Sequence, residues 1–309
     1  MNNKKYSGVV VPAVTPLTSN YQLDYEAVEK MFDRFYQNKV MPFIIGTTGE
    51  SASLPYSLKQ EYIKAAAKLK AKETILYAGI SSNCLQESIE LAKEAFDAGV
   101  DVVAATLPSY YAFSESQMKQ YFEQLAEQVP APVIIYNIPA TTHMSIPLKV
   151  IDELSYHENI VGTKDSERSE ERLQQSLSLW SKREDFSHFL GWAAKSVEAL
   201  INGSDGLIPS TGNLFPYIYN EMVKAVERGD NEEAYRFQKL SDVLGDLYQK
   251  GRLLGESLWA LKVLMREEGL CQSYIMPPLQ SLSMEEESKL ISVFKKTIIK
   301  QDTTYNKIT

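Results

Sequence analysis

The chain has 309 residues, of which 44% are hydrophobic and 23% charged, a composition that supplies enough apolar residues for a sizeable globular core. A formal net charge of −8 argues against nucleic acid or an anionic membrane surface as a partner, because both attract basic proteins. The first apolar run is too short for a signal peptide or a membrane span, which predicts a cytoplasmic protein.

Roughly eight short apolar, β-branched segments alternate with longer helical patterns, as in parallel strands joined by crossover helices. Eight strands close a (β/α)₈ TIM barrel, so this α/β fold is predicted. The expected strands are SGVVVPAV from Ser7, FIIG from Phe43, TILYAGI from Thr74, DVVAATLP from Asp101, PVIIYNIP from Pro132, NIVGTKDS from Asn159, SHFLGWAA from Ser187 and DGLIPSTGN from Asp205.

The segments between these strands have the period of amphipathic helices, whose apolar faces are expected in the core. One such face consists of Leu85, Ile89, Ala92 and Phe96, and another consists of Met118, Phe122, Leu125 and Val129. Ser57 and Ser114 each precede a glutamine at the spacing of a capping box, which predicts helix starts there. Gly99 is placed to end a helix.

Strand signals stop after residue 213, and helical patterns continue over residues 214–228, 231–249, 256–268 and 284–300. The sequence therefore predicts a barrel over residues 1–228 and a C-terminal helical extension, packed on the barrel, over residues 229–309. The two cysteines and three histidines have no ligand spacing, so we expect neither a disulfide framework nor a metal site.

Polar and aromatic side chains follow the expected strands, where the reacting groups of (β/α)₈ enzymes lie. They are Thr47 and Thr48 after the second strand, Tyr110 after the fourth, Tyr136 at the fifth, Lys164 at the sixth, Gly191 at the seventh and Ser210 at the eighth. We expect them to converge on one mouth of the barrel.

Lys164 is unusual among the lysines because it lies on a strand leaving the barrel centre. Burial disfavours an ammonium ion, and a free amine can attack a carbonyl and form a Schiff base. Tyr136 ends the neighbouring strand, about 4.8 Å away, where its phenol could pass a proton to and from a substrate. The alternatives are a lysine that reaches solvent beside Asp165 and a tyrosine that only packs.

The stretch GTTGES places two threonines between Gly46 and Gly49. Glycines permit a tight turn and close approach, and threonine hydroxyls and amides suit an anion, but the Lys-Ser/Thr ending of a Walker loop is absent. A plain strand-to-helix turn is the alternative. Glu50 is interpreted as a structural carboxylate at a helix start, stabilised by the helix dipole.

In order and spacing, the motifs GVVVPAVTPL, GTTGES, PSYYAFS, YNIPA, GTKDS and PPLQSLSMEE resemble the N-acetylneuraminate lyase and dihydrodipicolinate synthase family of class I Schiff-base aldolases. The resemblance implies that Lys164 forms an imine with pyruvate or another 2-oxo acid, and that Tyr136 relays protons. It implies that Thr47 and Thr48 hold the substrate carboxylate. It also implies that Tyr110 completes a relay with Thr47 and Tyr136 in a neighbouring subunit of a homotetramer, a dimer of dimers. No cofactor is expected, since the lysine amine supplies the electron sink.

Two departures from the family bear on the substrate. Dihydrodipicolinate synthases carry an arginine shortly after YN(V/I)P that holds the second substrate's carboxylate, and this chain has Thr141 or Thr142 there. Sialic acid lyases carry an acidic pair after the strand-seven glycine, where Gly191 is followed by Trp192 and two alanines. The remaining expectation is cleavage of a 2-keto-3-deoxy sugar acid into pyruvate and an aldehyde, or dehydration of such an acid.

For this substrate, Thr141, Thr142, Ser210 and Asn213 are candidates to bind hydroxyl groups, and Trp192 to form an apolar wall. Core packing is the alternative for Trp192. Three other functions stay open: a dihydrodipicolinate synthase that condenses pyruvate with aspartate semialdehyde through other groups, an N-acetylneuraminate lyase, and a non-catalytic barrel that binds a 2-oxo acid.

Overall fold

The computed structural model describes residues 4–305, with side chains described through residue 298, and contains a closed barrel of eight strands. The strands pair in parallel in chain order, and β1 closes the barrel against β8. They are β1 (Gly8–Pro12), β2 (Met41–Ile44), β3 (Tyr77–Gly79), β4 (Val102–Ala105), β5 (Val133–Asn137), β6 (Ile160–Asp165), β7 (Ser187–Leu190) and β8 (Gly206–Leu207). Each overlaps one expected segment, and the predicted fold is confirmed.

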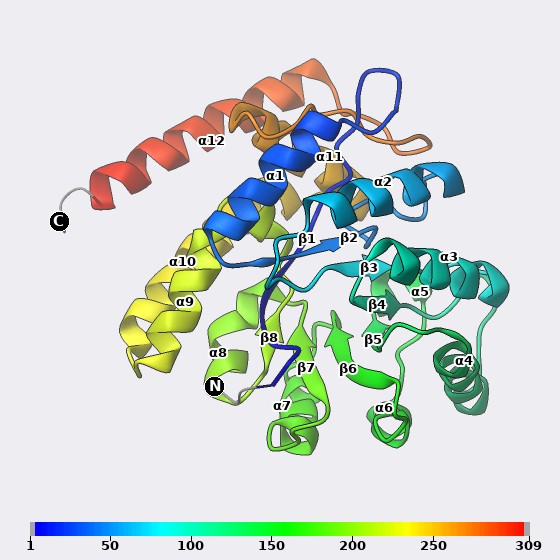
Figure 1. Ribbon diagram of the computed structural model, residues 1–309. Coiled ribbons are helices and arrows are strands. Elements are labelled where there is room, and N and C mark those ends of the chain that lie inside the picture. Colours follow the sequence, from blue (N-terminus) through cyan, green and yellow to red (C-terminus); the bar gives the residue numbers. More distant parts are fainter. Residues whose placement is uncertain (1–3, 306–309) are drawn as a thin grey trace.

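Helices surround the barrel on its outer side (Figure 1). They are α1 (Tyr25–Gln37), α2 (Tyr56–Leu69), α3 (Leu85–Ala98), α4 (Glu115–Gln128), α5 (Pro139–Thr142), α6 (Leu148–Leu154), α7 (Glu170–Trp180), α8 (Ser196–Ile201) and α9 (Tyr217–Glu227), with short 3₁₀ turns η1 (Ala193–Lys195) and η2 (Ser210–Asn213). The apolar face expected on α4 is buried throughout.

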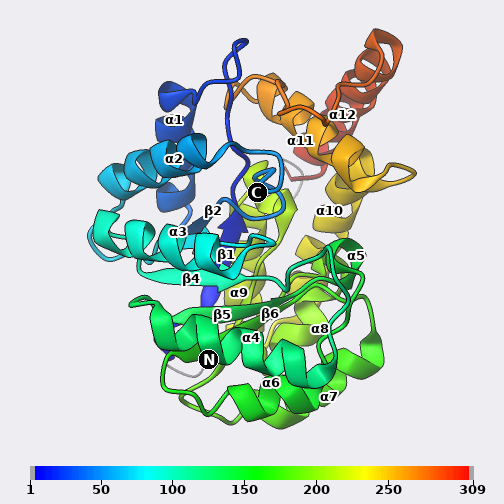
Figure 2. The same ribbon diagram turned by 90° about the vertical axis from the view of Figure 1, so that its right-hand side faces the viewer.

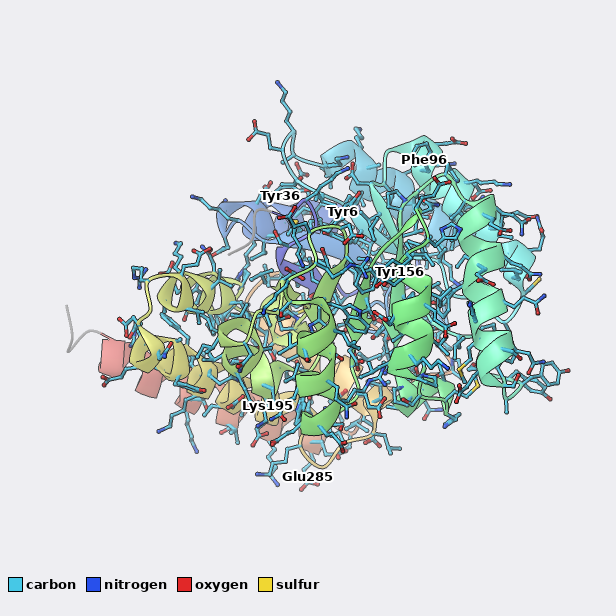
Figure 3. All side chains as sticks on the ribbon, turned by 90° about the horizontal axis from the view of Figure 1, so that it is seen from below. Tyr6, Tyr36, Phe96, Tyr156, Lys195 and Glu285 are labelled. Carbon is cyan, nitrogen blue, oxygen red and sulfur yellow. The ribbon has the colours of Figure 1, made fainter. Side chains whose placement is uncertain are left out.

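The apolar face expected on α3 is only partly buried. Ile89 and Ala92 of α3 are buried, whereas Phe96, labelled in Figure 3, is 44% exposed. The buried side of α3 is centred on Ser88, Ala92 and Ala95, whose small side chains allow close packing, and Phe96 lies at its margin. The prediction that Phe96 belongs to the core is therefore wrong.

The helix ends predicted at Ser114 and Gly99 are confirmed. The Gln117 N–H donates to the Ser114 hydroxyl at 3.4 Å, and the Ser114 N–H donates to the Gln117 side chain at 2.9 Å, which completes a capping box. Gly99 ends α3 with a φ of 109°, in the left-handed region that glycine tolerates best.

The capping box predicted at Ser57 is wrong. Helix α2 begins at Tyr56, and its N-cap is Pro55, so Ser57 already lies inside the first turn. Proline presets φ near the helical value and has no N–H to satisfy, which favours it at a helix start. The Gln60 side chain instead donates to Glu94 at 2.8 Å.

The strands bury both faces, and alternation along them decides which residues enter the barrel. Val10 of β1 belongs to an interior cluster with Phe43 and Phe189, whereas its neighbours Val9 and Val11 pack in the layer beneath the helices. Side chains two residues apart on a strand share a side. On β6 this alternation sends Lys164 inward and Asp165 outward, as their contacts below show.

Three further helices, α10 (Asn231–Gln249), α11 (Leu254–Glu267) and α12 (Met284–Tyr305), follow the barrel. They lie together on one side of it, outside the ring of helices, and α10 packs against α8 and α9 (Figures 1 and 2). Gly229 and Gly251, with φ values of 75° and 74°, provide the breaks between helices. The helices expected after residue 213 are confirmed, and the division at residues 228 and 229 stays a prediction.

Among the described residues, no helix combines the length and the apolar run that crossing a bilayer requires.

Candidate active site

Lys164 and Tyr136 are direct neighbours on paired strands. They face each other in the register of β5 and β6, and Lys164 is only 3% exposed. The Lys164 Nζ lies 3.8 Å from the centre of the Tyr136 ring and 5.0 Å from the centre of the Phe43 ring. Aromatic faces stabilise a cation at these distances. The expected proximity of the two side chains is confirmed.

The alternative of a lysine that reaches solvent beside Asp165 does not hold. Asp165 lies on the other side of β6, and its Oδ2 accepts a hydrogen bond from Nε of Arg172 on α7 at 2.6 Å. Lys164 is thus buried without a carboxylate from its own strand.

The Tyr136 phenol is buried beside a lysine and two hydroxyl groups, and its pKa is shifted. Burial alone raises its pKa, but the charge of Lys164 and the hydrogen bonds of neighbouring side chains outweigh burial, so the pKa lies below its ordinary value. One of these neighbours is Thr47, whose Oγ1 lies 3.2 Å from the Tyr136 oxygen. The cluster therefore links a threonine hydroxyl, a phenol with a lowered pKa and a buried amine.

The GTTGES segment forms a compact turn after β2, which we call the threonine turn (residues 46–50). The Gly49 N–H donates to the Gly46 carbonyl at 3.0 Å, which closes the turn. A Cβ on Gly49 would lie 3.0 Å from the Ala13 carbonyl oxygen, so glycine eases this close approach to the chain after β1. Thr48 is 8% exposed. The turn lies in the connection between β2 and α2, which begins only at Tyr56, and the alternative of a plain strand-to-helix turn stays open.

Glu50 is not at a helix start, and the prediction that a helix dipole stabilises it is wrong. It has a φ of 60° and lies well before α2, because the turns that follow β2 continue to Ser53. Its carboxylate forms a buried ion pair with Lys262 of α11. Lys262 is 212 positions away in the sequence, and no local pattern pointed to it.

A cavity of about 470 Å³ opens at the C-terminal ends of the strands, within the usual range for small-molecule sites. Phe43, Thr47 and Tyr136 line it, so the rings against which Lys164 lies form part of its wall. Several hydroxyl groups also line it, from Ser51, Ser53, Ser81, Ser82, Thr106, Ser109, Thr141 and Thr142. The cavity is thus polar, and it borders the rings that pack on the Lys164 amine.

Both threonines predicted to bind substrate hydroxyls line this cavity. The Thr141 hydroxyl donates to the Ile138 carbonyl at 3.2 Å, and the Thr142 hydroxyl has two carbonyl acceptors in reach, Ile138 at 3.2 Å and Met144 at 3.0 Å, so both hydrogens are used at the α5 turn. Their oxygens keep acceptor capacity toward a hydroxyl group of a ligand.

Tyr110 lies outside the cavity in the described chain. It is 78% exposed, its N–H donates to the Asn83 side chain at 3.1 Å, and its ring contacts Tyr111 edge to face at 4.9 Å between centroids. Tyr111 is 72% exposed. Two large aromatic side chains thus stand together on the surface of one chain.

Gly191, Trp192 and Ser210 lie at the ends of β7 and β8 but are not among the described residues that line the cavity. Trp192 lies beside Lys195, whose Nζ is 5.8 Å from its ring centre, and it is partly buried against the main core. The Ser210 hydroxyl is 2.7 Å from the phenol of Tyr248 on α10. Their predicted roles in binding stay predictions.

Asn213 cannot offer its amide to a substrate, contrary to expectation. Its Nδ2 donates to the carbonyls of Pro12 and Ser210, at 2.9 and 2.8 Å, and its Oδ1 accepts from the Val14 N–H at 3.2 Å. The side chain is 0% exposed. Asn213 therefore joins the ends of β1 and β8.

Sequence reasoning missed Ser166, which lies two residues after Lys164 and hence on the same side of the strand. Its hydroxyl is among the groups that lower the pKa of Tyr136. A Cβ on Gly191 would lie 2.1 Å from the Ser166 Oγ, so the glycine makes room for this side chain. The two-residue spacing from Lys164 was the feature of the sequence that could have identified Ser166.

Sequence reasoning also missed the polar network on the outer side of β5 and β6. Asp165 accepts hydrogen bonds from Arg172, from the Asn137 side chain at 3.2 Å and from the Glu167 N–H at 2.9 Å. Burial raises the pKa of the Asp165 carboxyl, while Arg172 and these donors act in the opposite direction. Because Asn137 and Asp165 follow Tyr136 and Lys164, the network ties together the strand ends that carry the site.

Comparison with known proteins points in one direction. The model of the dihydrodipicolinate synthetase family matches residues 5–297. A 4-hydroxy-tetrahydrodipicolinate synthase from Ectopseudomonas mendocina is 32% identical over 278 residues, which cover 90% of this chain and 93% of that protein.

Solved structures agree with this result. A dihydrodipicolinate synthase from Bacteroides thetaiotaomicron superimposes with a TM-score of 0.89 at 28% identity, covering 95% of this chain and 99% of that one. A dihydrodipicolinate synthase from Acinetobacter baumannii, crystallised in complex with pyruvate, superimposes with a TM-score of 0.85 at 25% identity, covering 94% and 98% of the two chains.

Proposed function

Because the chain belongs to the dihydrodipicolinate synthetase family, whose members are class I Schiff-base aldolases, we propose that Lys164 forms an imine with pyruvate or another 2-oxo acid. The observation that carries this proposal is the cluster of Lys164, Tyr136 and Thr47 at the mouth of the barrel. The relative from Acinetobacter baumannii binds pyruvate, which supports the same 2-oxo acid here.

In the proposed reaction the free Lys164 amine attacks the C2 carbonyl of the 2-oxo acid. The tetrahedral intermediate loses water to give the iminium ion, and Tyr136 supplies the proton that the departing hydroxyl needs. The lowered pKa of the Tyr136 phenol and its 3.2 Å contact with Thr47 support this relay, since both favour transfer of the proton in either direction.

The iminium ion then serves as the electron sink. For a 2-keto-3-deoxy sugar acid, the Tyr136 phenolate left by the previous step takes the proton of the C4 hydroxyl, the C3–C4 bond breaks, an aldehyde is released and an enamine remains on Lys164. Protonation of the enamine at C3 and hydrolysis of the imine release pyruvate and restore the amine. Thr47 and Thr48 are proposed to hold the carboxylate through amide and hydroxyl donors of the threonine turn.

The walls of the cavity support a sugar acid as substrate. No arginine is among the described residues that line it, so a second carboxylate finds no bidentate cation there. Hydroxyl groups are numerous instead, and they suit a hydroxylated carbon chain. Dehydration of such an acid uses the same iminium ion and is the second reaction to assay.

A second candidate is 4-hydroxy-tetrahydrodipicolinate synthesis, in which pyruvate condenses with aspartate semialdehyde. The observation that favours it is the name of the relative that is 32% identical over most of both chains. It requires another way to hold the aldehyde substrate's carboxylate, and Lys59 is the one lysine among the described residues that line the cavity.

Tyr110 supports a proposed homotetramer made of two tight pairs. In one chain its ring and that of Tyr111 are largely exposed, which is costly for two large aromatic side chains unless another surface covers them. In the proposed assembly Tyr110 reaches the site of the neighbouring subunit. Analytical ultracentrifugation of the purified chain and of Tyr110→Ala tests this, with a stable monomer as the contrary result.

The proposed function is tested by assaying pyruvate release from a panel of 2-keto-3-deoxy sugar acids, beside condensation of pyruvate with aspartate semialdehyde. Release from one sugar acid, abolished by Lys164→Ala and retained by Lys59→Ala, is the expected result. Condensation without cleavage would support the second candidate. If the chain catalyses neither reaction and still binds pyruvate, the remaining function is a non-catalytic barrel that binds a 2-oxo acid.

A further inference from the structure

The ion pair between Glu50 and Lys262 connects the threonine turn to helix α11. Both side chains are 0% exposed. The Glu50 Oε2 also accepts from the Met276 N–H at 2.6 Å, and the Lys262 Nζ donates to the Tyr274 carbonyl at 2.8 Å. Both charges are therefore desolvated, and each depends on the other for compensation.

The backbone at Glu50 needs such an anchor. Its φ of 60° lies in the left-handed region, which is uncommon for residues other than glycine and persists where surrounding contacts enforce it. The Glu50 N–H donates to the Thr47 carbonyl at 3.1 Å, and the Glu50 carbonyl accepts from the Ser53 N–H at 2.8 Å. A shift of Glu50 would thus be passed directly to Thr47.

The same helix also borders the cavity. Leu254, Gly255 and Leu258 of α11 line it together with Leu279 from the following segment, and Leu258 lies one helical turn before Lys262. Helix α11 therefore supplies both a wall of the cavity and the counter-charge for the threonine turn. Neither oxygen of Glu50 is left for a ligand, because Lys262 and the Met276 N–H occupy them.

We propose that Glu50 and Lys262 are positioning residues that hold the threonine turn for catalysis, so that helix α11 is part of the active site. The inference rests on the proposed function of Thr47 and Thr48. The pair acts by keeping the Thr47 hydroxyl 3.2 Å from the Tyr136 phenol and the amides of the turn facing the substrate carboxylate.

The chain offers a matched control at the opposite end of the barrel. Lys4 and Asp205 form a second buried ion pair at 2.8 Å, with side chains 3% and 4% exposed, and Lys4 also donates to the Phe186 carbonyl at 3.0 Å. Asp205 directly precedes β8, whereas the threonine turn follows the end of β2. Lys4→Met therefore breaks an equally buried pair far from the threonine turn.

The test compares Lys262→Met with Lys4→Met in the full chain, at a temperature where both are folded. Hydrogen exchange of peptides covering residues 46–51 is measured without substrate, and the rate of imine formation is measured by borohydride trapping with pyruvate. In Lys262→Met we expect faster exchange in the turn and imine formation slower by roughly tenfold to a hundredfold, the effect of misplacing a catalytic group by about 1 Å. Lys4→Met should show neither change.

If Lys262→Met does not fold, the double variant Glu50→Gln, Lys262→Met replaces it. This variant removes both charges, while the new amide oxygen can still accept from the Met276 N–H, and the same two changes are expected. Turn exchange and trapping rates equal to those of Lys4→Met would overturn the inference. If the unmutated chain traps no pyruvate, the proposed function fails, and the exchange comparison still decides whether the pair holds the turn.

Discussion

Replacing Tyr136 with phenylalanine removes one oxygen atom and keeps the ring on which the Lys164 Nζ lies. The 3.8 Å contact between Nζ and the ring centre survives, and so does the packing of a residue that is 4% exposed. The 3.2 Å contact with the Thr47 hydroxyl is lost. The substitution thus separates the proposed proton relay from the structural role of the ring.

Two magnitudes follow from this geometry. Loss of one hydrogen bond whose other member keeps access to water costs about 1 kcal/mol of folding stability. Loss of a positioned general acid and base lowers the rate by roughly 10²–10⁴, or about 3–5 kcal/mol of activation free energy. The effect on kcat should therefore be far larger than the effect on stability.

The assay measures kcat and KM with the best substrate from the panel, and the free energy of unfolding in urea. Tyr219→Phe is the matched control, because the Tyr219 phenol is also buried and bonds the Ser241 hydroxyl at 2.6 Å, away from the site. It should keep its kcat, and because the buried Ser241 hydroxyl loses its partner it should lose at least as much stability as Tyr136→Phe. A Tyr136→Phe enzyme within tenfold of the unmutated kcat would refute the relay.

Three further predictions concern the barrel, two of them near the site and one at its opposite end. Gly191→Ala places a methyl group 2.1 Å from the Ser166 Oγ, which must move away from Tyr136. Because the Ser166 hydroxyl helps to lower the pKa of Tyr136, the pH profile of kcat/KM should shift to higher pH in Gly191→Ala and in Ser166→Ala. An unchanged profile in both variants would contradict this role. Arg172→Met leaves the Asp165 carboxyl buried without its cation and should cost about 3 kcal/mol of unfolding free energy in urea, whereas a loss below about 1 kcal/mol would show that Asn137 and the Glu167 N–H suffice. Burial, with the charges of Arg172 and Lys4, lowers the pKa of His188 to about 3. Between that pH and about 6.5 the unfolded chain binds a proton that the folded chain does not, so the free energy of unfolding decreases as pH falls through this window. At pH 5 the loss is about 2 kcal/mol relative to pH 8, and His188→Gln should reduce it; equal pH dependence in the variant would exclude His188 as the cause.

The barrel was predictable from the sequence because its signals are local. Short β-branched runs such as VVVP and VIIY, separated by helical periods, mark strands and crossovers whatever the rest of the chain does. The neighbouring positions of Tyr136 and Lys164 follow from the parallel register of adjacent strands once the barrel is assumed. The cluster at the mouth of the barrel was therefore within reach of sequence reasoning.

The misses depend on contacts between distant parts of the chain. In the sequence Lys262 does not differ from other helical lysines, and only the fold buries it against Glu50. Arg172 likewise pairs with Asp165 only because α7 packs beside β6. Phe96 has the right helical period, but it lies at the margin of a buried side that includes the small residues Ser88, Ala92 and Ala95. Periodicity reports which side of a helix is apolar and leaves open which residues at its margin are covered.

The central claim is that Lys164 carries the imine. Its most direct test is to incubate the chain with pyruvate, reduce with borohydride, digest and locate the adduct by peptide mass spectrometry. We expect one reduced pyruvyl group per chain, on Lys164, and none in Lys164→Ala. No adduct, an adduct on another lysine, or one that persists in Lys164→Ala would contradict the account.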